Sequence, residues 1–295
     1  MQAIIKTKNL TKYYGKTRGV EELNLEVKKG EIFGFLGPNG AGKTTTIRLL
    51  LHLIKPTSGE AFIFDKEVGR SYIKILGEIG YLSGDLNLYG EMTGKQLLKF
   101  AGSFYRNNFE KFQKEATERL GCELNKSYKS LSSGNKQKIG ILLAIFHKPK
   151  LLILDEPTSG LDPLTQNEFY KLLFDLKEKG TTIFFSSHNL PEVEKVCDRV
   201  GIIREGRLAD VETIDEIRGH RRKEVEIYFV GPYKKKDFSS IKDIEILEAR
   251  KEYIRLFAKS SATERLIKIL ANYKIKDINF SYPDLEDVFL KYYGS

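Results

Sequence analysis

The segment GPNGAGKTT, Gly37 to Thr45, constrains the fold of this chain more than any other stretch. It matches the pattern G-x-x-x-x-G-K-[ST], and it lies between an apolar run with strand character and a run with helical spacing. Glycines at this spacing let successive backbone amides turn toward a phosphate, and the positive end of the following helix adds to that field. The motif therefore predicts a phosphate-binding loop in which Lys43 bridges the β- and γ-phosphates of a nucleotide and Thr44 places its hydroxyl on Mg²⁺.

Strands and helices are expected to alternate around this loop. Short apolar runs predict strands at residues 3–10, 23–27, 31–37, 151–156, 181–188, 199–206 and 207–210. Helical spacing predicts helices at residues 44–54, 92–105, 109–121, 139–146, 164–180 and 190–198, and a Pro/Gly turn is predicted at 55–60. This alternation favours an α/β fold with a parallel sheet wrapped on both faces, which binds ligands at the carboxyl ends of its strands.

Two carboxylates and a histidine stand at the ends of predicted strands. The strand LLILDE closes on Asp155 and Glu156, and the strand TTIFFSSH closes on His188. We expect Asp155 to hold the Mg²⁺ shell and Glu156 to orient and deprotonate the attacking water. His188 is predicted to reach the same sheet edge, where a neutral imidazole can link the γ-phosphate to the catalytic carboxylate or the water.

At 295 residues the chain suits one large α/β domain and one smaller domain. We predict a nucleotide-binding domain at 1–218, with a helical subdomain at about 85–145, and a C-terminal accessory α/β domain at 219–295. In the accessory domain strands are predicted at 224–230, 244–248, 253–258 and 277–282, a helix is predicted to begin at a capping box formed by Ser261 and Glu264, and a last helix is predicted after Pro283.

Composition and charge exclude several classes of protein. The longest apolar runs fall far short of the roughly 20 residues that a membrane helix needs, and the N-terminus does not read as a secretory signal, so we expect a cytoplasmic protein. Cys122 and Cys197 lie far apart and suit neither a disulfide framework nor a zinc site. The net charge of +9 is spread along the chain, so no nucleic-acid partner is expected.

The order of the motifs from about Ala3 to Asp210 resembles that of the ATP-binding cassette (ABC) ATPases. GPNGAGKTT resembles the family's Walker A motif, LSSGNKQK at 131–138 the signature motif, LLILDEP Walker B, SGLD at 159–162 the D-loop, and His188 the switch histidine. The resemblance implies a P-loop NTPase core with an antiparallel β subdomain and a helical subdomain. It also implies nucleotide binding by Tyr14 on the adenine and by the Walker A residues Gly37, Pro38, Asn39, Gly40, Ala41, Gly42, Lys43, Thr44 and Thr45.

The same resemblance implies ATP and Mg²⁺ as cofactors and a second ATPase subunit as partner, in a homodimer or a heterodimer. The signature residues Ser132, Ser133, Gly134 and Asn135 would then act in trans on the phosphate held by the other subunit, next to Asp162 of the D-loop. GNKQK and the final phrase YPDLEDVFLKYYG resemble the subset of the family that powers two-component exporters of drugs and antibiotics. That subset implies a separate integral membrane permease, with this subunit peripheral on the inner face of the cell membrane.

The sequence departs from the family pattern at two places. Where the family has a metal-contacting glutamine after IGYL, this chain has Gly84, and Asp85 is a candidate replacement; a turn aspartate explains Asp85 equally well. Ser133 and Asn135 replace the commoner Gly and Gln of the signature, although Ser132 still offers a hydroxyl and Gly134 still allows close backbone approach.

Three other functions compete with an exporter subunit. A soluble ABC ATPase acting on nucleic acid or ribosomes would carry a long coiled coil or a second cassette, and the sequence shows neither. A P-loop kinase would leave the signature and SGLD unexplained. A pure interaction module would leave Lys43, Asp155, Glu156 and His188 without a role.

Overall fold

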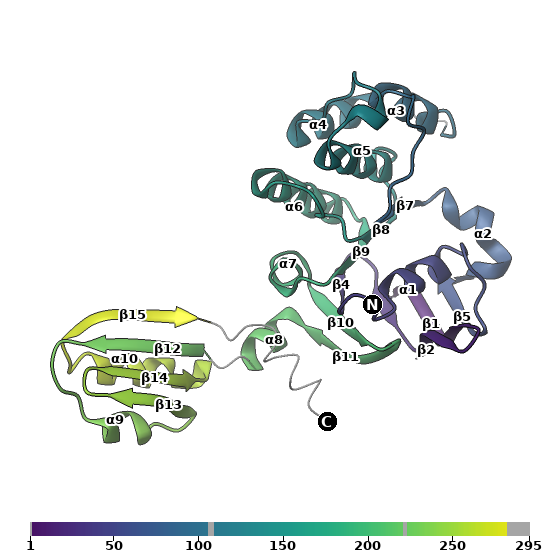
Figure 1. Cartoon of the computed structure of the whole chain (residues 1–295). Helices are drawn as coiled ribbons and strands as arrows, with labels where there is room; N and C mark the ends of the chain where they lie inside the picture. The colour runs from purple at the N-terminus through teal and green to yellow at the C-terminus, as the bar shows by residue number, and fades with distance from the viewer. Residues whose placement is uncertain (1, 106–108, 221–222, 282–295) are drawn as a thin grey trace. The chain divides into compact units, whose positions relative to one another are not determined.

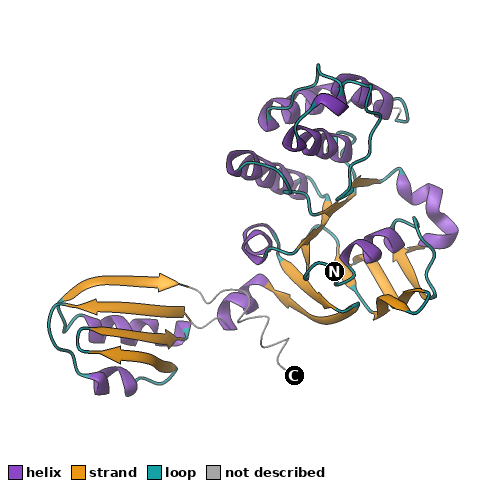
Figure 2. Ribbon diagram, viewed as in Figure 1, coloured by secondary structure: helices purple, strands orange, loops and turns teal. Residues whose placement is uncertain are grey.

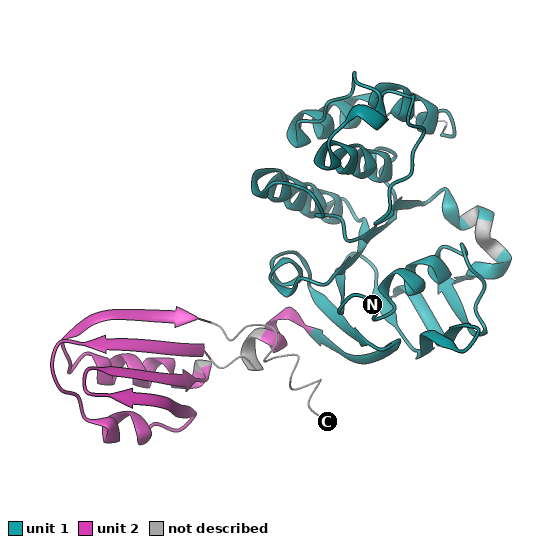
Figure 3. Ribbon diagram, in the orientation of Figure 1, with its two compact units in different colours: residues 1–212 teal, residues 213–295 magenta. Residues whose placement is uncertain are grey.

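The computed structural model describes residues 2–105, 109–220 and 223–281. Packing between Cα atoms divides the chain into two units, Met1–Glu212 and Thr213–Ser295, which Figure 3 colours separately. The predicted boundary after residue 218 falls at the end of a short helix, α8 (Ile214–His220), and remains a prediction.

A six-stranded sheet forms the centre of the first unit (Figures 1 and 2). Its strand order is β11-β10-β4-β9-β8-β7, with bounds β4 Ile32–Leu36, β7 Ile79–Leu82, β8 Leu151–Asp155, β9 Thr182–Ser187, β10 Arg199–Arg204 and β11 Arg207–Thr213. The pairs β10–β4, β4–β9, β9–β8 and β8–β7 are parallel. Every residue of β4, β8 and β9 is buried, as expected for parallel strands covered on both faces.

Helices pack on this sheet and bring the loops at its carboxyl edge into place. The helix α1 (Lys43–Leu50) contacts β8, whereas α6 (Pro163–Glu178) and α7 (Leu190–Val196) contact β9. In Figure 1, α6 and α7 lie to one side of the sheet and α1 to the other. The prediction of a parallel sheet with helices on both faces is confirmed.

An antiparallel sheet covers the other part of the first unit. Its strands are β1 (Ala3–Tyr14), β2 (Thr17–Leu23), β3 (Glu26–Lys28), β5 (Ser58–Ile63) and β6 (Lys66–Glu67), in the order β2-β1-β5-β6 with β3 also on β1. The predicted strand at 23–27 is interrupted: Leu23 ends β2, Glu26 begins β3, and residues 24 and 25 belong to neither strand. Part of the predicted turn at 55–60 belongs to β5, because Lys8 and Thr11 of β1 pair with Glu60 and Ser58.

The two sheets share one apolar core with α1. Phe33 and Phe35 of β4 both pack against the ring of Phe184 of β9, at 6.0 and 5.3 Å between ring centroids. The same cluster includes Ile5 of β1, Ile47 of α1 and Ile63 of β5, all fully buried. Burial of this surface fixes the orientation of α1, and with it the phosphate-binding loop that precedes it.

The helical subdomain contains α3 (Gly94–Gly102), α4 (Glu110–Leu120), the 3₁₀ turn η1 (Tyr128–Ser130) and α5 (Ser133–Ile145). The helix α2 (Val68–Leu76) precedes β7. The predicted helix at 139–146 is wrong at its start: α5 begins six residues earlier because Ser132 caps it, accepting a hydrogen bond from the Asn135 amide. The predicted helix at 44–54 also ends early, at Leu50.

The second unit is a βαββαβ arrangement with its own core. Its elements are β12 (Lys223–Phe229), α9 (Lys235–Ser239), β13 (Ile244–Arg250), β14 (Tyr253–Ala258), η2 (Ser260–Ala262), α10 (Thr263–Leu270) and β15 (Ile275–Ser281), with strand order β13-β14-β12-β15. Ile227, Ile254, Leu256 and Phe238 are fully buried at its centre.

The predicted capping box of the second unit is wrong. Ser261 lies in η2 and its hydroxyl donates to Asp243 Oδ2 at 3.1 Å, while α10 has no side-chain cap. The Ser261 hydroxyl, which the local pattern predicted as a helix cap, forms a hydrogen bond with a residue distant in sequence instead. The helix predicted after Pro283 lies outside the described residues.

Candidate active site

The predicted phosphate-binding loop joins the end of β4 to the start of α1. Gly42 precedes the helix with a φ of 108°, and a Cβ there would lie 2.6 Å from the Gly19 carbonyl oxygen. Only glycine fits this conformation and this space without strain. The loop therefore holds its amides at the N-terminus of a helix, where both the free N–H groups and the helix dipole favour an anion.

Lys43 is the first residue of α1, and its side chain is 6% exposed. Its Nζ donates to the carbonyl oxygens of Gly37 and Pro38 at 2.7 and 3.2 Å, so the ammonium lies under the loop. It also forms an ion pair of 3.2 Å with Glu156 Oε1. The geometry brings the lysine of the loop and the second carboxylate of LLILDE together.

Asp155 ends β8 and is 2% exposed. Its Oδ2 accepts a hydrogen bond from Thr44 Oγ1 at 2.9 Å, and its Oδ1 accepts one from Ser186 Oγ at 2.7 Å. The parallel register that pairs Asp155 with Ser186 produces the second bond. A hydroxyl and a carboxylate held this close are oxygen donors of the kind that Mg²⁺ prefers.

Glu156 and His188 lie together at the same edge of the sheet. His188 Nδ1 is 2.7 Å from Glu156 Oε2. Glu156 has a φ of 50°, a conformation that is uncommon for a side chain of this size. Among the described residues Oε1 of Glu156 is buried and accepts no hydrogen bond, although it pairs with Lys43. Lys43 and His188 thus hold the two oxygens of a carboxylate, a group that can act as a general base toward water.

A hollow of about 350 Å³ opens above the loop. Eight predicted residues line it, together with three that the sequence did not indicate: Tyr14, Asn39, Gly40, Gly42, Lys43, Thr44, Thr45 and Glu156, and Thr17, Arg18 and Gly19. The Tyr14 side chain is 46% exposed at its rim, whereas the Tyr13 hydroxyl is bonded to Glu21. Of the two tyrosines in KYYG, Tyr14 is thus the one available to stack on a base.

Sequence reasoning missed four residues of this site. Thr17, Arg18 and Gly19 belong to β2, a strand that was not predicted, because its sequence TRGVEEL alternates only weakly between apolar and polar residues. Ser186 lies in the predicted strand TTIFFSSH, where no motif indicates a role for it. Pairing the predicted strands 151–156 and 181–188 in parallel register could have placed it beside Asp155.

The signature residues lie outside the hollow, at the start of α5. Ser132 and Ser133 are exposed, and Ser132 Oγ accepts from the Asn135 amide at 3.3 Å. A Cβ on Gly134 would lie 2.8 Å from the Gly160 carbonyl oxygen, so the signature helix touches the SGLD turn within one chain. Gln137 Nε2 donates to the Pro157 carbonyl oxygen at 2.8 Å and adds a second link between these segments.

Asp162, in the same turn, caps α6. Its carboxylate accepts from the Thr165 amide at 2.9 Å and from the Thr165 hydroxyl at 2.6 Å. These hydrogen bonds, the one from the hydroxyl first, hold the pKa of Asp162 below its ordinary value. The aspartate is therefore ionised where the turn meets the helix dipole.

Asp85 is exposed. Its neighbour Gly84 is the residue that lies beside Asp155, the candidate ligand of the metal. A Cβ on Gly84 would lie 3.5 Å from the Asp155 carbonyl oxygen and 3.6 Å from its Oδ2. Burial raises the pKa of Tyr81, and the charges of Asp155 and Asp85 add to this rise. Asp85 thus lies near the site, and its part in metal binding remains a prediction.

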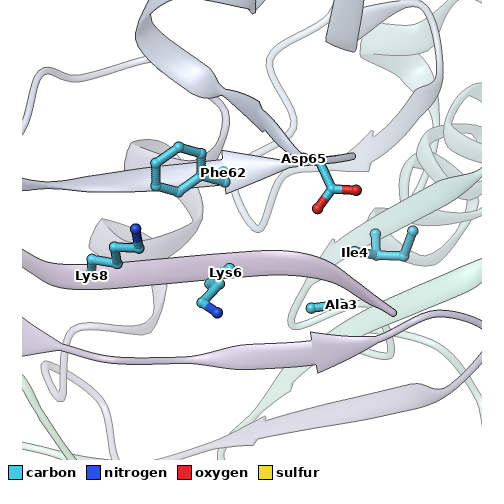
Figure 4. Close-up of a pocket in the computed structure, with 6 residues that line it drawn as sticks. All are labelled: Ala3, Ile4, Lys6, Lys8, Phe62 and Asp65. Carbon is cyan, nitrogen blue, oxygen red and sulfur yellow. The ribbon is translucent and has the colours of Figure 1, made fainter. Parts of the chain in front are cut away.

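A second hollow, of about 160 Å³, lies on the antiparallel sheet (Figure 4). Ala3, Ile4, Lys6, Lys8, Phe62 and Asp65 line it, and Asp65 accepts a hydrogen bond from Gln2 at 2.6 Å. It contains none of the predicted site residues. Within the described ranges no three His, Cys, Asp or Glu side chains group as a metal site; a magnesium ion held by Thr44, Asp155 and phosphate oxygens needs no such group.

Comparison with known families and proteins identifies this arrangement. Residues 20–159 match the family model of the ABC transporter. The bacitracin transport ATP-binding protein BcrA of Bacillus licheniformis is 39% identical, over 100% of this chain and 98% of that protein. The linearmycin resistance ATP-binding protein LnrL of Bacillus subtilis (strain 168) is 36% identical, over 71% of this chain and 69% of that protein.

A solved structure shares the fold of the first unit. The dimeric, post-hydrolysis structure of the ATP-binding cassette MJ0796 with ADP and Pi has a TM-score of 0.65 and 27% identity, over 71% of this chain and 98% of that one. None of these names favours the alternative of an ATPase acting on nucleic acid or ribosomes. The chain therefore belongs to the ABC transporter family, as an ATP-binding and ATP-hydrolysing subunit that energises an exporter.

Proposed function

We propose that this chain pairs with a second ATPase subunit, identical or related, and that the pair drives a separate integral membrane permease. The exported compound is an antibiotic or a similar drug, since relatives are named for bacitracin transport and linearmycin resistance. In this proposal residues 1–218 are the ATPase domain and 219–295 an accessory domain. The subunit binds to the permease on the cytoplasmic face of the membrane. Its similarity to ATP-binding subunits of transporters supports this location.

The grouping of Lys43, Glu156 and His188 is the observation that carries the chemistry. Lys43 is buried beneath the loop and provides a positive charge for the β- and γ-phosphates of ATP. Glu156 stands between Lys43 and His188, at 3.2 and 2.7 Å, and takes the proton of the attacking water. His188 orients Glu156, and its other ring nitrogen forms a hydrogen bond with the γ-phosphate or with the attacking water.

Thr44 and Asp155 are proposed to hold magnesium. Their oxygens lie 2.9 Å apart, and the Ser186 hydroxyl fixes the carboxylate from the other side. Mg²⁺, when bound, neutralises charge on the phosphate oxygens and orients them for in-line attack. Tyr14 stacks on the adenine, and the loop amides of residues 37–45 surround the phosphates.

The placement of the signature residues supports the proposed pairing. Ser132 and Ser133 are exposed and lie outside the hollow that contains Lys43. An exposed, capped helix start with two hydroxyls suits a phosphate carried by another subunit. Each shared site would then consist of one subunit's Walker A loop and its partner's signature, and the dimeric cassette with ADP and Pi supports this proposal.

The membrane-spanning part of the transporter is assigned to the permease. In the described parts of the chain, no helix has the length and apolar character that crossing a bilayer requires. The +9 net charge is spread over the sequence, a distribution that does not favour a nucleic-acid partner.

Glu156→Gln tests the proposed chemistry. The amide cannot accept the proton of water, so we expect ATP hydrolysis to fall by at least about 10²-fold while ATP still binds. Because the nucleotide then persists at the shared interface, a dimer should accumulate with ATP in size-exclusion chromatography. Glu118→Gln, on the exposed surface of α4, is the control and should behave as the parent.

The transport part is tested in cells that express the chain with a candidate permease. We expect tolerance to the exported drug to rise, and Glu156→Gln to return it to that of cells without the transporter. Hydrolysis by Glu156→Gln at the parent's rate would show that the base is wrongly assigned. Copurification with ribosomes or DNA instead of a membrane protein would contradict export.

A further inference from the structure

Glu192, in the first turn of α7, collects hydrogen bonds from two segments that lead to the site. Its Oε1 accepts from Thr158 Oγ1 at 2.5 Å and its Oε2 from Ser187 Oγ at 2.9 Å. Burial raises the pKa of Tyr170 on α6, and the charge of Glu192 and a hydrogen bond to it raise this pKa further. Thr158, Ser187 and Tyr170 are all at least nine-tenths buried. One carboxylate, itself partly exposed, thus joins three elements through buried donors.

Two of these donors flank the catalytic side chains in sequence. Thr158 is two residues after Glu156, in a turn closed by hydrogen bonds from the Ser159 amide to the Glu156 carbonyl oxygen and from the Leu161 amide to the Thr158 carbonyl oxygen. Ser187 directly precedes His188, and its Oγ also accepts from the Asn189 amide at 2.9 Å. Glu192 therefore anchors both chain segments from which Glu156 and His188 project.

The backbone of Glu156 makes this anchor important. A φ of 50° for a glutamate persists only where the surrounding structure holds it. The Glu156 amide donates to Ser186 on one side, and the turn that contains Thr158 holds it on the other. Loss of the Thr158 anchor would free this turn, whereas loss of the Ser187 anchor would free the segment that contains His188.

We propose that Glu192 is a positioning residue for ATP hydrolysis: its carboxylate sets the distance between Glu156 and His188. The inference rests on the proposed roles of those two residues. A displacement of about 1 Å at a reacting group can lower a rate on the order of 10²-fold. Glu192 does not line the hollow, so its loss should act mainly on turnover and leave nucleotide binding largely intact.

Glu192→Ala in the full chain is the main test. We expect kcat for ATP hydrolysis to fall by about 10- to 100-fold, with the KM for ATP and the ATP-induced dimer within about threefold of the parent. Glu192→Gln should recover part of the rate, because its amide oxygen still accepts one hydroxyl. Glu118→Ala on the surface of α4 is the control and should keep the parent's kcat.

Thr158→Val and Ser187→Ala separate positioning from general stability. Each should lower kcat less than Glu192→Ala does, and neither should lower it further in the Glu192→Ala background, because the shared carboxylate is already gone. These two variants also decide the matter if Glu192→Ala fails to fold: parent-like kcat in both would overturn the inference.

Two further outcomes have distinct meanings. Parent-like kcat in Glu192→Ala, or equal losses in kcat, nucleotide binding and unfolding temperature, would overturn the positioning role. If Glu156→Gln hydrolyses ATP as the parent does, the proposed chemistry itself fails, and the inference about Glu192 falls with it.

Discussion

At the scale of single residues, the site depends on close approaches that only particular side chains allow. Lys43 is buried beneath carbonyl oxygens of its own loop, and Asp155 is held by hydroxyls from two different elements. Burial strengthens such contacts, because the local dielectric is lower than that of water. Small residues matter as much, since Gly42 and Gly134 lie where a methyl group would meet a carbonyl oxygen.

Gly134→Ala tests the contact between the signature and the SGLD turn. The new Cβ would lie 2.8 Å from the Gly160 carbonyl oxygen, so the helix start must move away from the turn. We expect ATP-dependent dimerisation to weaken and turnover to fall on the order of 10²-fold, while a single chain still binds ATP. Fluorescent-nucleotide binding, light scattering and phosphate release measure the three properties.

Gly102→Ala is the matched control for this change. Gly102 also lies in a helix of the same subdomain, but no atom comes within 4 Å of a Cβ placed there. Parent-like dimerisation in Gly134→Ala would show that the contact does not govern the signature's position.

At the scale of elements, capping decides where the functional helices begin. Ser132 caps α5, Asp162 caps α6, and the Thr93 side chain and Gln96 form a capping box on α3. Each cap satisfies an amide that the helix leaves unpaired and so fixes the entry of the chain. Two of these caps, Ser132 and Asp162, are also predicted site residues, so local helix geometry and function share the same side chains.

Asp162→Asn isolates the charge of one cap. Asparagine caps a helix as well as aspartate but carries no charge. The folded pKa of Asp162 lies below its unfolded value of about 3.9, so its ionisation stabilises the fold fully above that value. This contribution is lost as the pH falls through the folded pKa. We expect the parent to be the more stable at pH 7, and the difference to vanish in the acid range.

Urea unfolding of the parent and of Asp162→Asn at several pH values measures this difference. Asp162→Ala, which loses the cap as well, should remain less stable than Asp162→Asn at every pH. If the difference in free energy of unfolding between the parent and Asp162→Asn does not change with pH, the charge of Asp162 does not stabilise the helix.

At the scale of the whole molecule, each of the two units has an apolar core of its own. The core of the first unit runs from the antiparallel sheet through α1 to the parallel sheet, and the core of the second lies between its sheet and α9 and α10. All predicted site residues belong to Met1–Glu212. A substitution in one core should therefore destabilise the unit that contains it and leave the stability of the other unit unchanged.

Leu256→Ala tests the independence of the two units. Leu256 is fully buried in β14, so its truncation should destabilise the second unit by about 2–5 kcal/mol. Leu247→Ala, at a 41% exposed position on β13, should change stability by less than about 0.5 kcal/mol. We expect the KM for ATP to stay at the parent's value in both.

Urea titrations followed by circular dichroism and by ATPase activity separate the units. If Leu256→Ala lowers the urea midpoint of ATPase loss as much as the spectroscopic midpoint, the units do not unfold independently. That result would also favour a supporting role of the accessory domain for the ATPase.

Much of the site could be predicted from sequence because its signals are local. The nine residues of the Walker A loop, the two carboxylates at and directly after the end of β8, and the histidine that follows β9 each stand at the end of an apolar run. The apolar runs also predicted the parallel sheet, and parallel strands place their carboxyl ends at one edge. Local capping signals were less reliable: Ser132 caps a helix, whereas Ser261 bonds to Asp243 instead.

The amino-acid sequence by itself determined the family, the phosphate-binding loop and the choice of side chains that we propose for the chemistry. Only the tertiary structure decided that Ser186 holds Asp155, that Gly84 lies beside Asp155, and that β2 lines the hollow. It also decided that Glu192 accepts hydrogen bonds from both Thr158 and Ser187. The physical reason is the range of the interactions: motifs and caps act over a few residues, whereas these contacts join residues far apart in the chain, whose meeting depends on strand register and core packing.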